Sequence, residues 1–266
     1  MKNETMKRDL RRGELIICQD AEELALRAAM HFVELAEQFI TRNGRFCVAL
    51  SGGSTPRGLY ARLARPPFRE RVIWSRVHLF WGDERCVPPD HPESNYGMVQ
   101  RELLTKVPIP PANVHRMPVE KDPEEAAIEY AHILRAFFGL AAQELPALDL
   151  VLLGLGEDGH TASLFPGTGV LHEQTEMVRA VFVEKLGASR LTLTAAVFNH
   201  AANVTFLVSG ERKAAILREV LLGEEQPDRL PAQLIAPTWG KLLWIVDGDA
   251  AREIVRQMSS VSQDSP

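Results

Sequence analysis

Short apolar runs alternate with stretches of helical periodicity along this chain, and that alternation limits the possible folds more than any other feature. Residues 46–50, 77–81 and 148–153 are almost entirely apolar, as in strands that are buried on both faces. Strands that alternate with helices form mainly parallel sheets, because a crossover must carry the chain back between parallel neighbours. The expected fold class is therefore α/β, with a mainly parallel sheet covered by helices on both faces in a Rossmann-like three-layer α/β/α arrangement.

Capping and stop signals give the expected helices approximate bounds. Asp20 can cap a helix that Asn43-Gly44 ends, Thr55-Pro56 is typical of a helix start, and Ser94 can cap a third helix. Apolar residues at helical spacing predict another helix over 123–142, and one more is expected from about 211 to 222. Further strands are expected over 14–18, 178–183, 190–194, 204–208 and 241–246.

No repeat of fixed period divides the 266 residues, so a single α/β domain is expected over 1–266. Frayed ends are expected near 1–12 and 259–266. The first twelve residues lack the apolar segment of a secretory signal, and no run of 18 apolar residues occurs in the chain. We therefore expect a cytoplasmic protein that does not act at a membrane.

The charge balance argues against a nucleic-acid partner. The chain has 30 Lys and Arg against 35 Asp and Glu, a formal net charge of −5, so it lacks a global positive field that would attract a polyanion. Three cysteines without a C-x-x-C pair fit reduced thiols better than disulfides. A small molecule is the expected partner, and a monomer and a homodimer both stay open.

Three polar, glycine-rich segments each follow an expected strand. They are SGGSTP at 51–56, GDER at 82–85 and GLGEDGHTASLFPG at 154–167. Ligands of parallel α/β sheets bind outside the carboxyl ends of the strands, where these segments should meet. Their convergence predicts a binding site.

The first of these segments suits a phosphate. Gly52, Gly53, Ser54 and Thr55 place small residues and backbone N–H groups just before a helix, where the helix dipole favours an anion. An ordinary strand-to-helix turn capped by Thr55 is the alternative, and the two readings carry similar weight on this segment alone. The P-loop pattern is missing from the chain.

The third segment also matches the dinucleotide pattern G-x-G-x-x-G at 154–159. That fingerprint needs its third glycine to open a helix, whereas Pro166, Gly167 and Gly169 interrupt the stretch too soon. A nicotinamide enzyme is therefore disfavoured.

Asp158 and His160 flank Gly159 in the same segment, so that a carboxylate and an imidazole can share one pocket. An imidazole with an ordinary pKa of about 6.5 suits the removal of a proton from water at neutral pH. A surface or capping histidine is the more common reading of an isolated D-G-H. The other histidines show no spacing typical of a metal site.

Several other charged side chains could contribute to the same pocket. Asp83, Glu84 and Arg85 end an expected strand and could supply a carboxylate base or a phosphate-binding guanidinium group, or form a surface salt-bridge cluster. Arg190 and Lys213 are individually typical of exposed cations.

Taken together and in this order, these segments resemble the 6-phosphogluconolactonase family, part of a broader group that includes glucosamine-6-phosphate deaminase. The resemblance covers nearly the whole chain, and DGHTASLFP is its most specific stretch. The matching stretches are SGGSTPRGLY (51–60), WGDERCVPPDHPESNYGM (81–98), LDLVLLGLGEDGHTASLFPG (148–167), SRLTLT (189–194) and VTFLVSGERKAAIL (204–217).

The resemblance implies a hydrolase that converts 6-phosphoglucono-δ-lactone to 6-phosphogluconate in the oxidative pentose phosphate pathway, without a metal or an organic cofactor. His160 would be the general base that activates water, and Asp158 would orient it. Arg85 could also lie nearer the lactone than the phosphate. The implied substrate-binding residues are Gly52, Gly53, Ser54, Thr55, Asp83, Arg85, Arg190 and Lys213.

Two other functions stay open at this point. Glucosamine-6-phosphate deaminases carry a Glu five residues after the histidine, where this chain has Phe165, and D-E-Y where this chain has Asp83-Glu84-Arg85. Both departures favour a lactonase. A non-catalytic sugar-phosphate sensor is the second alternative, because similar folds serve as effector domains of some bacterial repressors. About 45 residues precede the first glycine-rich loop, and they predict a strand and a long helix rather than a helix-turn-helix.

Overall fold

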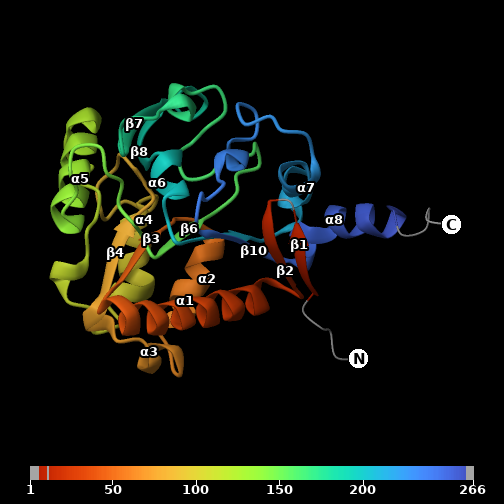
Figure 1. The fold of residues 1–266 in the computed structure, drawn as a ribbon, viewed down its shortest axis with the longest axis horizontal. Helices are drawn as coiled ribbons and strands as arrows, with labels where there is room; N and C mark the ends of the chain where they lie inside the picture. Colours follow the sequence, from red (N-terminus) through yellow and green to blue (C-terminus); the bar gives the residue numbers. More distant parts are fainter. Residues whose placement is uncertain (1–5, 11, 262–266) are drawn as a thin grey trace.

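The computed structural model describes residues 6–10 and 12–261, and its centre is a seven-stranded sheet (Figure 1). The strands lie in the order β1, β2, β10, β9, β6, β3, β4, with β1 antiparallel to β2 and the other six strands parallel. This arrangement confirms the expected α/β class with a mainly parallel sheet. The bounds are β1 (Met6–Leu10), β2 (Gly13–Cys18), β3 (Phe46–Leu50), β4 (Val77–Trp81), β6 (Leu150–Leu153), β9 (Asn203–Val208) and β10 (Lys241–Asp247).

Helices flank this sheet. Helices α1 and α2 pack against each other below the sheet in Figure 1, and α6 and α7 lie above it. The bounds are α1 (Ala21–Asn43), α2 (Ser54–Leu63), α3 (Phe68–Arg71), α4 (Asn95–Val99), α5 (Pro123–Phe138), α6 (Ala195–Asn199), α7 (Ala214–Leu222) and α8 (Gly248–Val261). Within residues 6–10 and 12–261, none of the helices is both long and apolar enough to cross a membrane.

The longest helix, α1, has the ends that the sequence predicts. The Asp20 side chain accepts hydrogen bonds of 2.9 Å from the backbone N–H groups of Glu22 and Glu23, and Gly44 ends the helix with a φ of 74°. On the buried face, Phe32 meets Phe46 of β3 edge to face, with ring centroids 5.3 Å apart. Full burial of one such side chain contributes about 1.5–3 kcal/mol, so α1 is held mainly through this apolar face.

A second, antiparallel sheet holds two of the expected strands. It has the order β5 (Asp83–Arg85), β8 (Ala188–Leu193) and β7 (Val178–Val183). A 3₁₀ turn over Glu184–Leu186 joins β7 to β8, and α5 packs against both of these strands. The polar segment that follows β4 is thereby held in place as the edge strand β5.

Three expected helix bounds are corrected by the structure. The helix expected over 123–142 ends at Phe138, because Gly139 adopts a left-handed conformation with a φ of 67°. Helix α2 begins at Ser54 with Gly53 as its N-cap residue, so the start precedes the expected Thr55-Pro56 and the alternative reading of Thr55 as the cap is wrong. The first turn of the helix expected over 211–222 is a 3₁₀ turn, and α7 begins after it.

Both ends of the chain are more ordered than expected over part of their length. Met6–Leu10 pairs with β2 along its whole length as β1, and α8 continues to Val261. The fraying expected over 1–12 and 259–266 is therefore wrong for these residues. The rest of those two ends, 1–5, 11 and 262–266, lies outside the described residues.

Two histidines lie together beneath α5, away from the carboxyl ends of the strands. His78 Nδ1 is 3.3 Å from His115 Nε2, and the Phe137 ring lies against both imidazoles. Burial lowers the pKa of His115 to about 4, with a further lowering from His78, and burial also lowers the pKa of His78, to which the Arg45 guanidinium adds. The folded protein therefore holds both imidazoles neutral at pH 7.

This histidine pair should make folding sensitive to acid. Because the folded-state pKa values are lowered, the folded chain binds fewer protons than the unfolded chain between pH 6.5 and 4, and stability falls as the pH falls through that range. We expect His115→Phe to reduce the loss between pH 6.5 and 4.5 by about 1–2 kcal/mol, measured by urea denaturation at each pH. An identical pH slope in the variant and the wild type would show that the pair does not titrate on unfolding.

Candidate active site

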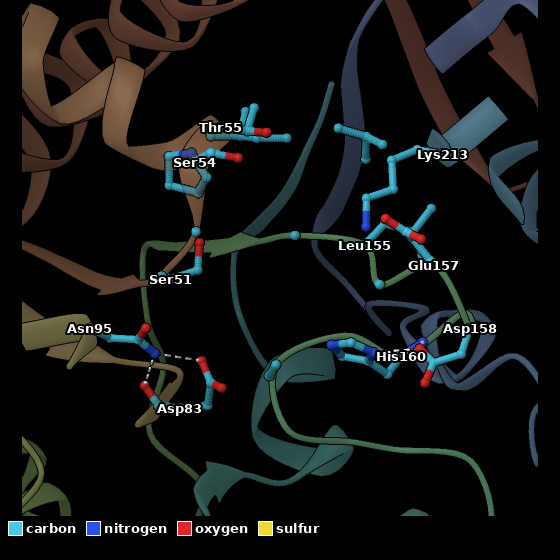
Figure 2. A pocket seen from close by; sticks show the side chains of 18 of the residues that line it. Ser51, Ser54, Thr55, Asp83, Asn95, Leu155, Glu157, Asp158, His160 and Lys213 are labelled. Atoms are coloured by element: carbon cyan, nitrogen blue, oxygen red, sulfur yellow. Dashed lines mark hydrogen bonds and ion pairs between the residues drawn. The ribbon is translucent and has the colours of Figure 1, made fainter. Parts of the chain in front are cut away.

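A cavity of about 640 Å³ opens at the carboxyl ends of the parallel strands. Segments that follow β3, β4, β6 and β9 line it, in the place where parallel α/β sheets bind ligands. The structure brings together every catalytic and substrate-binding residue that the family resemblance implies, and Figure 2 shows several of them around the cavity. These residues are Gly52, Gly53, Ser54, Thr55, Asp83, Arg85, Asp158, His160, Arg190 and Lys213.

The N-terminus of α2 forms one end of the cavity. Gly53, the N-cap residue, has a φ of 103°, a conformation that L side chains rarely adopt. Lys213 points into the cavity from the opposite side, on the 3₁₀ turn that precedes α7 (Figure 2). Burial lowers the pKa of this half-buried lysine, and the nearby Glu157 carboxylate opposes that effect. A helix N-terminus that faces an ammonium group is well suited to a phosphate.

The His160 imidazole is held by Asp158, as the D-G-H spacing allows. His160 Nδ1 lies 2.5 Å from Asp158 Oδ1, and the His160 backbone N–H donates to the same oxygen at 3.2 Å. A carboxylate accepts hydrogen bonds only, so Nδ1 is assigned the proton and Nε2 keeps its lone pair. In Figure 2 the ring extends from the side of Asp158 toward the cavity. The free lone pair is thus available to take a proton there.

The surroundings of His160 keep it neutral. The Phe165 ring stacks on the imidazole with centroids 4.1 Å apart. Burial lowers the pKa of His160 to about 4; Asp83 opposes this, while the cations Lys213, Arg190 and Arg85 lower the pKa further. At pH 7 the imidazole is therefore uncharged, which is the state that a general base requires.

Asp83 is fixed by side chains from two other segments. Asn95 donates through Nδ2 to the Asp83 backbone oxygen at 3.0 Å and to Oδ1 at 3.3 Å (Figure 2). Ser163 donates through Oγ to Asp83 Oδ2 at 2.8 Å. The carboxylate is 6% exposed, so these donors hold it at the edge of the cavity.

Glu84 is a structural residue and does not line the cavity. It is 1% exposed, and it accepts from the backbone N–H groups of Asn95 and Tyr96 and from Ser94 Oγ. Burial raises the pKa of Glu84, and the backbone donors lower it. Glu84 thus anchors the start of α4, which carries Asn95 into the site.

Two arginines face each other across the second sheet. Arg85 of β5 and Arg190 of β8 are directly paired in the antiparallel register. Burial lowers the pKa of Arg190, and Arg85 lowers it further. Within the described part of the chain, the buried Nε atoms of both arginines have no hydrogen-bond partner. Like charges directly opposite each other are unfavourable in a sheet, so this pair suits an anionic ligand.

Some lining residues were not singled out from the sequence. Asn95 and Lys185 both line the cavity. Asn95 lies in the stretch 81–98 that carries the family resemblance but has no motif of its own there, whereas Lys185 lies outside all of the matching stretches. Phe165, which the sequence marks as a departure from the deaminases, lies against the candidate base.

Comparison with known proteins identifies the family of this chain. A family model described as "Glucosamine-6-phosphate isomerases/6-phosphogluconolactonase" matches residues 19–244, most of the chain. The chain belongs to this family. The 6-phosphogluconolactonase of Synechocystis sp. is 44% identical over 216 residues, which are 81% of this chain and 87% of the relative. That of Haemophilus influenzae is 36% identical over 233 residues, 86% of this chain and 98% of the relative.

Solved structures of the 6-phosphogluconolactonase/glucosamine-6-phosphate isomerase family share the fold. The 6-phosphogluconolactonase of Trypanosoma cruzi superposes with a TM-score of 0.80 at 29% identity, covering 95% of this chain and 99% of that structure. The corresponding Trypanosoma brucei structure gives 0.79 at 28%, covering 92% and 99%. A monomeric glucosamine-6-phosphate deaminase matches with a TM-score of 0.76 at 21% identity, covering 90% and 99%. This last likeness shows the shared fold only.

A methyl group at residue 52 should disturb the site. A Cβ on Gly52 would lie 1.8 Å from Asn95 Oδ1, so Asn95 would have to move away from Asp83. We expect Gly52→Ala to lower the free energy of unfolding by about 1–3 kcal/mol, measured by urea denaturation. The matched control is Gly154→Ala, which adds the same group where no described atom lies within 4 Å. Equal effects of the two variants would contradict the close approach as the cause.

Proposed function

We propose that this chain is a 6-phosphogluconolactonase, which hydrolyses 6-phosphoglucono-δ-lactone to 6-phosphogluconate with His160 as the general base. The observation that carries the proposal is a neutral imidazole, held by Asp158, that points into a cavity whose far end is suited to a phosphate. The relatives named 6-phosphogluconolactonase, which this chain matches over most of its length, support the same substrate.

The phosphate is assigned to the N-terminus of α2 and Lys213. There the backbone N–H groups of the first helical turn and an ammonium group meet across the cavity. Binding energy at the phosphate would fix the sugar ring, so that the lactone carbonyl is positioned for the reaction at the other end of the cavity.

His160 then moves one proton through the reaction. Nε2 takes a proton from water as the water oxygen bonds to the lactone carbonyl carbon, and Nδ1 keeps its hydrogen bond to Asp158. The tetrahedral intermediate collapses with cleavage of the bond between that carbon and the ring oxygen, which receives the proton from Nε2. The resulting carboxylic acid releases a proton to solvent at pH 7, and this release makes the reaction measurable.

The arginine pair is assigned to negative charge on the substrate. Arg85 and Arg190 both lower the pKa of His160, so their positive charge reaches the place where the base acts. A positive field there stabilises the oxygen that becomes negative in the tetrahedral intermediate more than it stabilises the neutral carbonyl.

We further propose that residues 1–266 form one domain that acts in the cytoplasm. The buried residues of the sheet and its helices make one contiguous apolar cluster from Leu15 to Ile254, which supports a single unit. A rice relative that is 37% identical is described as chloroplastic, so the compartment differs among relatives.

Replacement of the base should remove most of the activity. We expect His160→Gln to lower kcat/KM for freshly prepared 6-phosphoglucono-δ-lactone by about 10²- to 10⁴-fold, measured by proton release and corrected for spontaneous hydrolysis. The control is His172→Gln, because the His172 side chain is 72% exposed and lies outside the cavity. Near-normal hydrolysis by His160→Gln would exclude the mechanism. No hydrolysis by the wild type would exclude the function and lead to assays of glucosamine 6-phosphate turnover and of ligand binding.

Loss of the Lys213 charge should weaken binding of the phosphorylated substrate selectively. We expect Lys213→Met to raise KM for the phosphorylated lactone by about 10- to 100-fold, because one charge-assisted contact is lost. Hydrolysis of the unphosphorylated glucono-δ-lactone should change little. A similar loss with both substrates would mean that Lys213 acts on the lactone rather than the phosphate.

A further inference from the structure

Lys185 reaches the candidate base from the second sheet. It lies on the 3₁₀ turn between β7 and β8, 27 residues from Asp158 in sequence, and it lines the same cavity as His160. The sequence analysis did not single it out. Its side chain is 52% exposed, so the alternative is that Lys185 is a solvated surface lysine with no part in the site.

The contacts of Lys185 are to the two residues that hold the base. Its Nζ forms an ion pair with Asp158 Oδ2, while Oδ1 of the same carboxylate lies against His160 Nδ1. The ammonium group also lies over the Phe165 ring, 5.0 Å from its centroid, and that ring stacks on the imidazole. One lysine therefore contacts both the hydrogen-bonding partner and the stacking partner of His160.

We propose that Lys185 is a positioning residue, which holds the Asp158 carboxylate and the Phe165 ring against His160 and so fixes the orientation of the base. This inference rests on the proposed function only for its effect on the rate. The coupling of Lys185 to His160 through Asp158 is a property of the protein without substrate.

The stability of an exposed ion pair does not explain the arrangement. Pairs of this exposure contribute little to folding, because solvent screens the two charges. What sets Lys185 apart is its partner, Asp158, because the other oxygen of that carboxylate is hydrogen-bonded to the His160 imidazole. The consequence of losing Lys185 should therefore appear at His160 rather than in the free energy of unfolding.

The charge of Lys185 should also act on the proton affinity of His160. A carboxylate beside an imidazole favours the protonated form, and an ammonium group on that carboxylate offsets part of the effect. The other charged groups that act on the imidazole are the carboxylate of Asp83 and the cations Lys213, Arg190 and Arg85. These stay in place when Lys185 is replaced, so a change can be traced to the released Asp158 charge.

The first test measures the titration of the His160 ring by NMR, from pH 3 to 7.5, with His160→Gln used to assign the signal. We expect Lys185→Met to shift the midpoint upward by about 0.5–1 pH unit, and Lys185→Arg to restore it. The control is Lys121→Met: Lys121 is also 52% exposed and paired with a carboxylate, Glu129, outside the cavity. A midpoint that does not move in Lys185→Met would overturn the proposal.

The second test measures the rate with 6-phosphoglucono-δ-lactone. We expect Lys185→Met to lower kcat by about 3- to 30-fold, because the base is no longer held in one orientation, with KM nearly unchanged and with rescue by Lys185→Arg. An unchanged kcat, or a loss confined to KM, would overturn the positioning role. If the wild type itself does not hydrolyse the lactone, the proposed function fails, whereas the NMR titration still decides whether Lys185 acts on His160.

Discussion

The parallel pairing of six strands is the constraint on which the site depends. Because β3, β4, β6 and β9 run in one direction, the segments that follow them emerge at one edge of the sheet. Each segment brings a different chemical group to that edge: the start of a helix, an acidic and basic edge strand, an imidazole with its carboxylate, and a lysine. None of these segments forms a site alone, and the backbone hydrogen bonds of the buried strands determine how they meet.

Glycine at two positions leaves room for side chains that form the site. A Cβ on Gly156 would lie 2.0 Å from His160 Nδ1, and one on Gly52 would overlap the Asn95 side chain. The backbone of one loop therefore lies where a larger residue would displace the base or the amide that holds Asp83. Gly156, the second glycine of the dinucleotide-like pattern, is thus required by the imidazole rather than by a helix, since residues 154–168 contain no helix.

The sequence predicted the main sheet, most helices and the candidate residues, because periodicity, caps and motifs are local signals. The left-handed glycine that ends α5 was also visible, and the bound was placed too late only because the apolar pattern continues beyond it. The second sheet was not predicted, since a short apolar run looks alike in parallel and antiparallel strands. Asn95 and Lys185 were missed because their roles depend on contacts that form only when the chain folds: Asn95 turns back to Asp83 twelve residues earlier, and Lys185 reaches Asp158 from another segment.

The facing arginines of β5 and β8 also affect the protein before substrate arrives. The like charges of Arg85 and Arg190, together with their unpartnered Nε atoms, place an electrostatic cost on the pairing of β5 with β8. A bound anion offsets that repulsion, so ligand binding and the pairing of these two strands support each other. The second sheet is thus coupled to anion binding through these two charges, as well as forming a wall of the cavity.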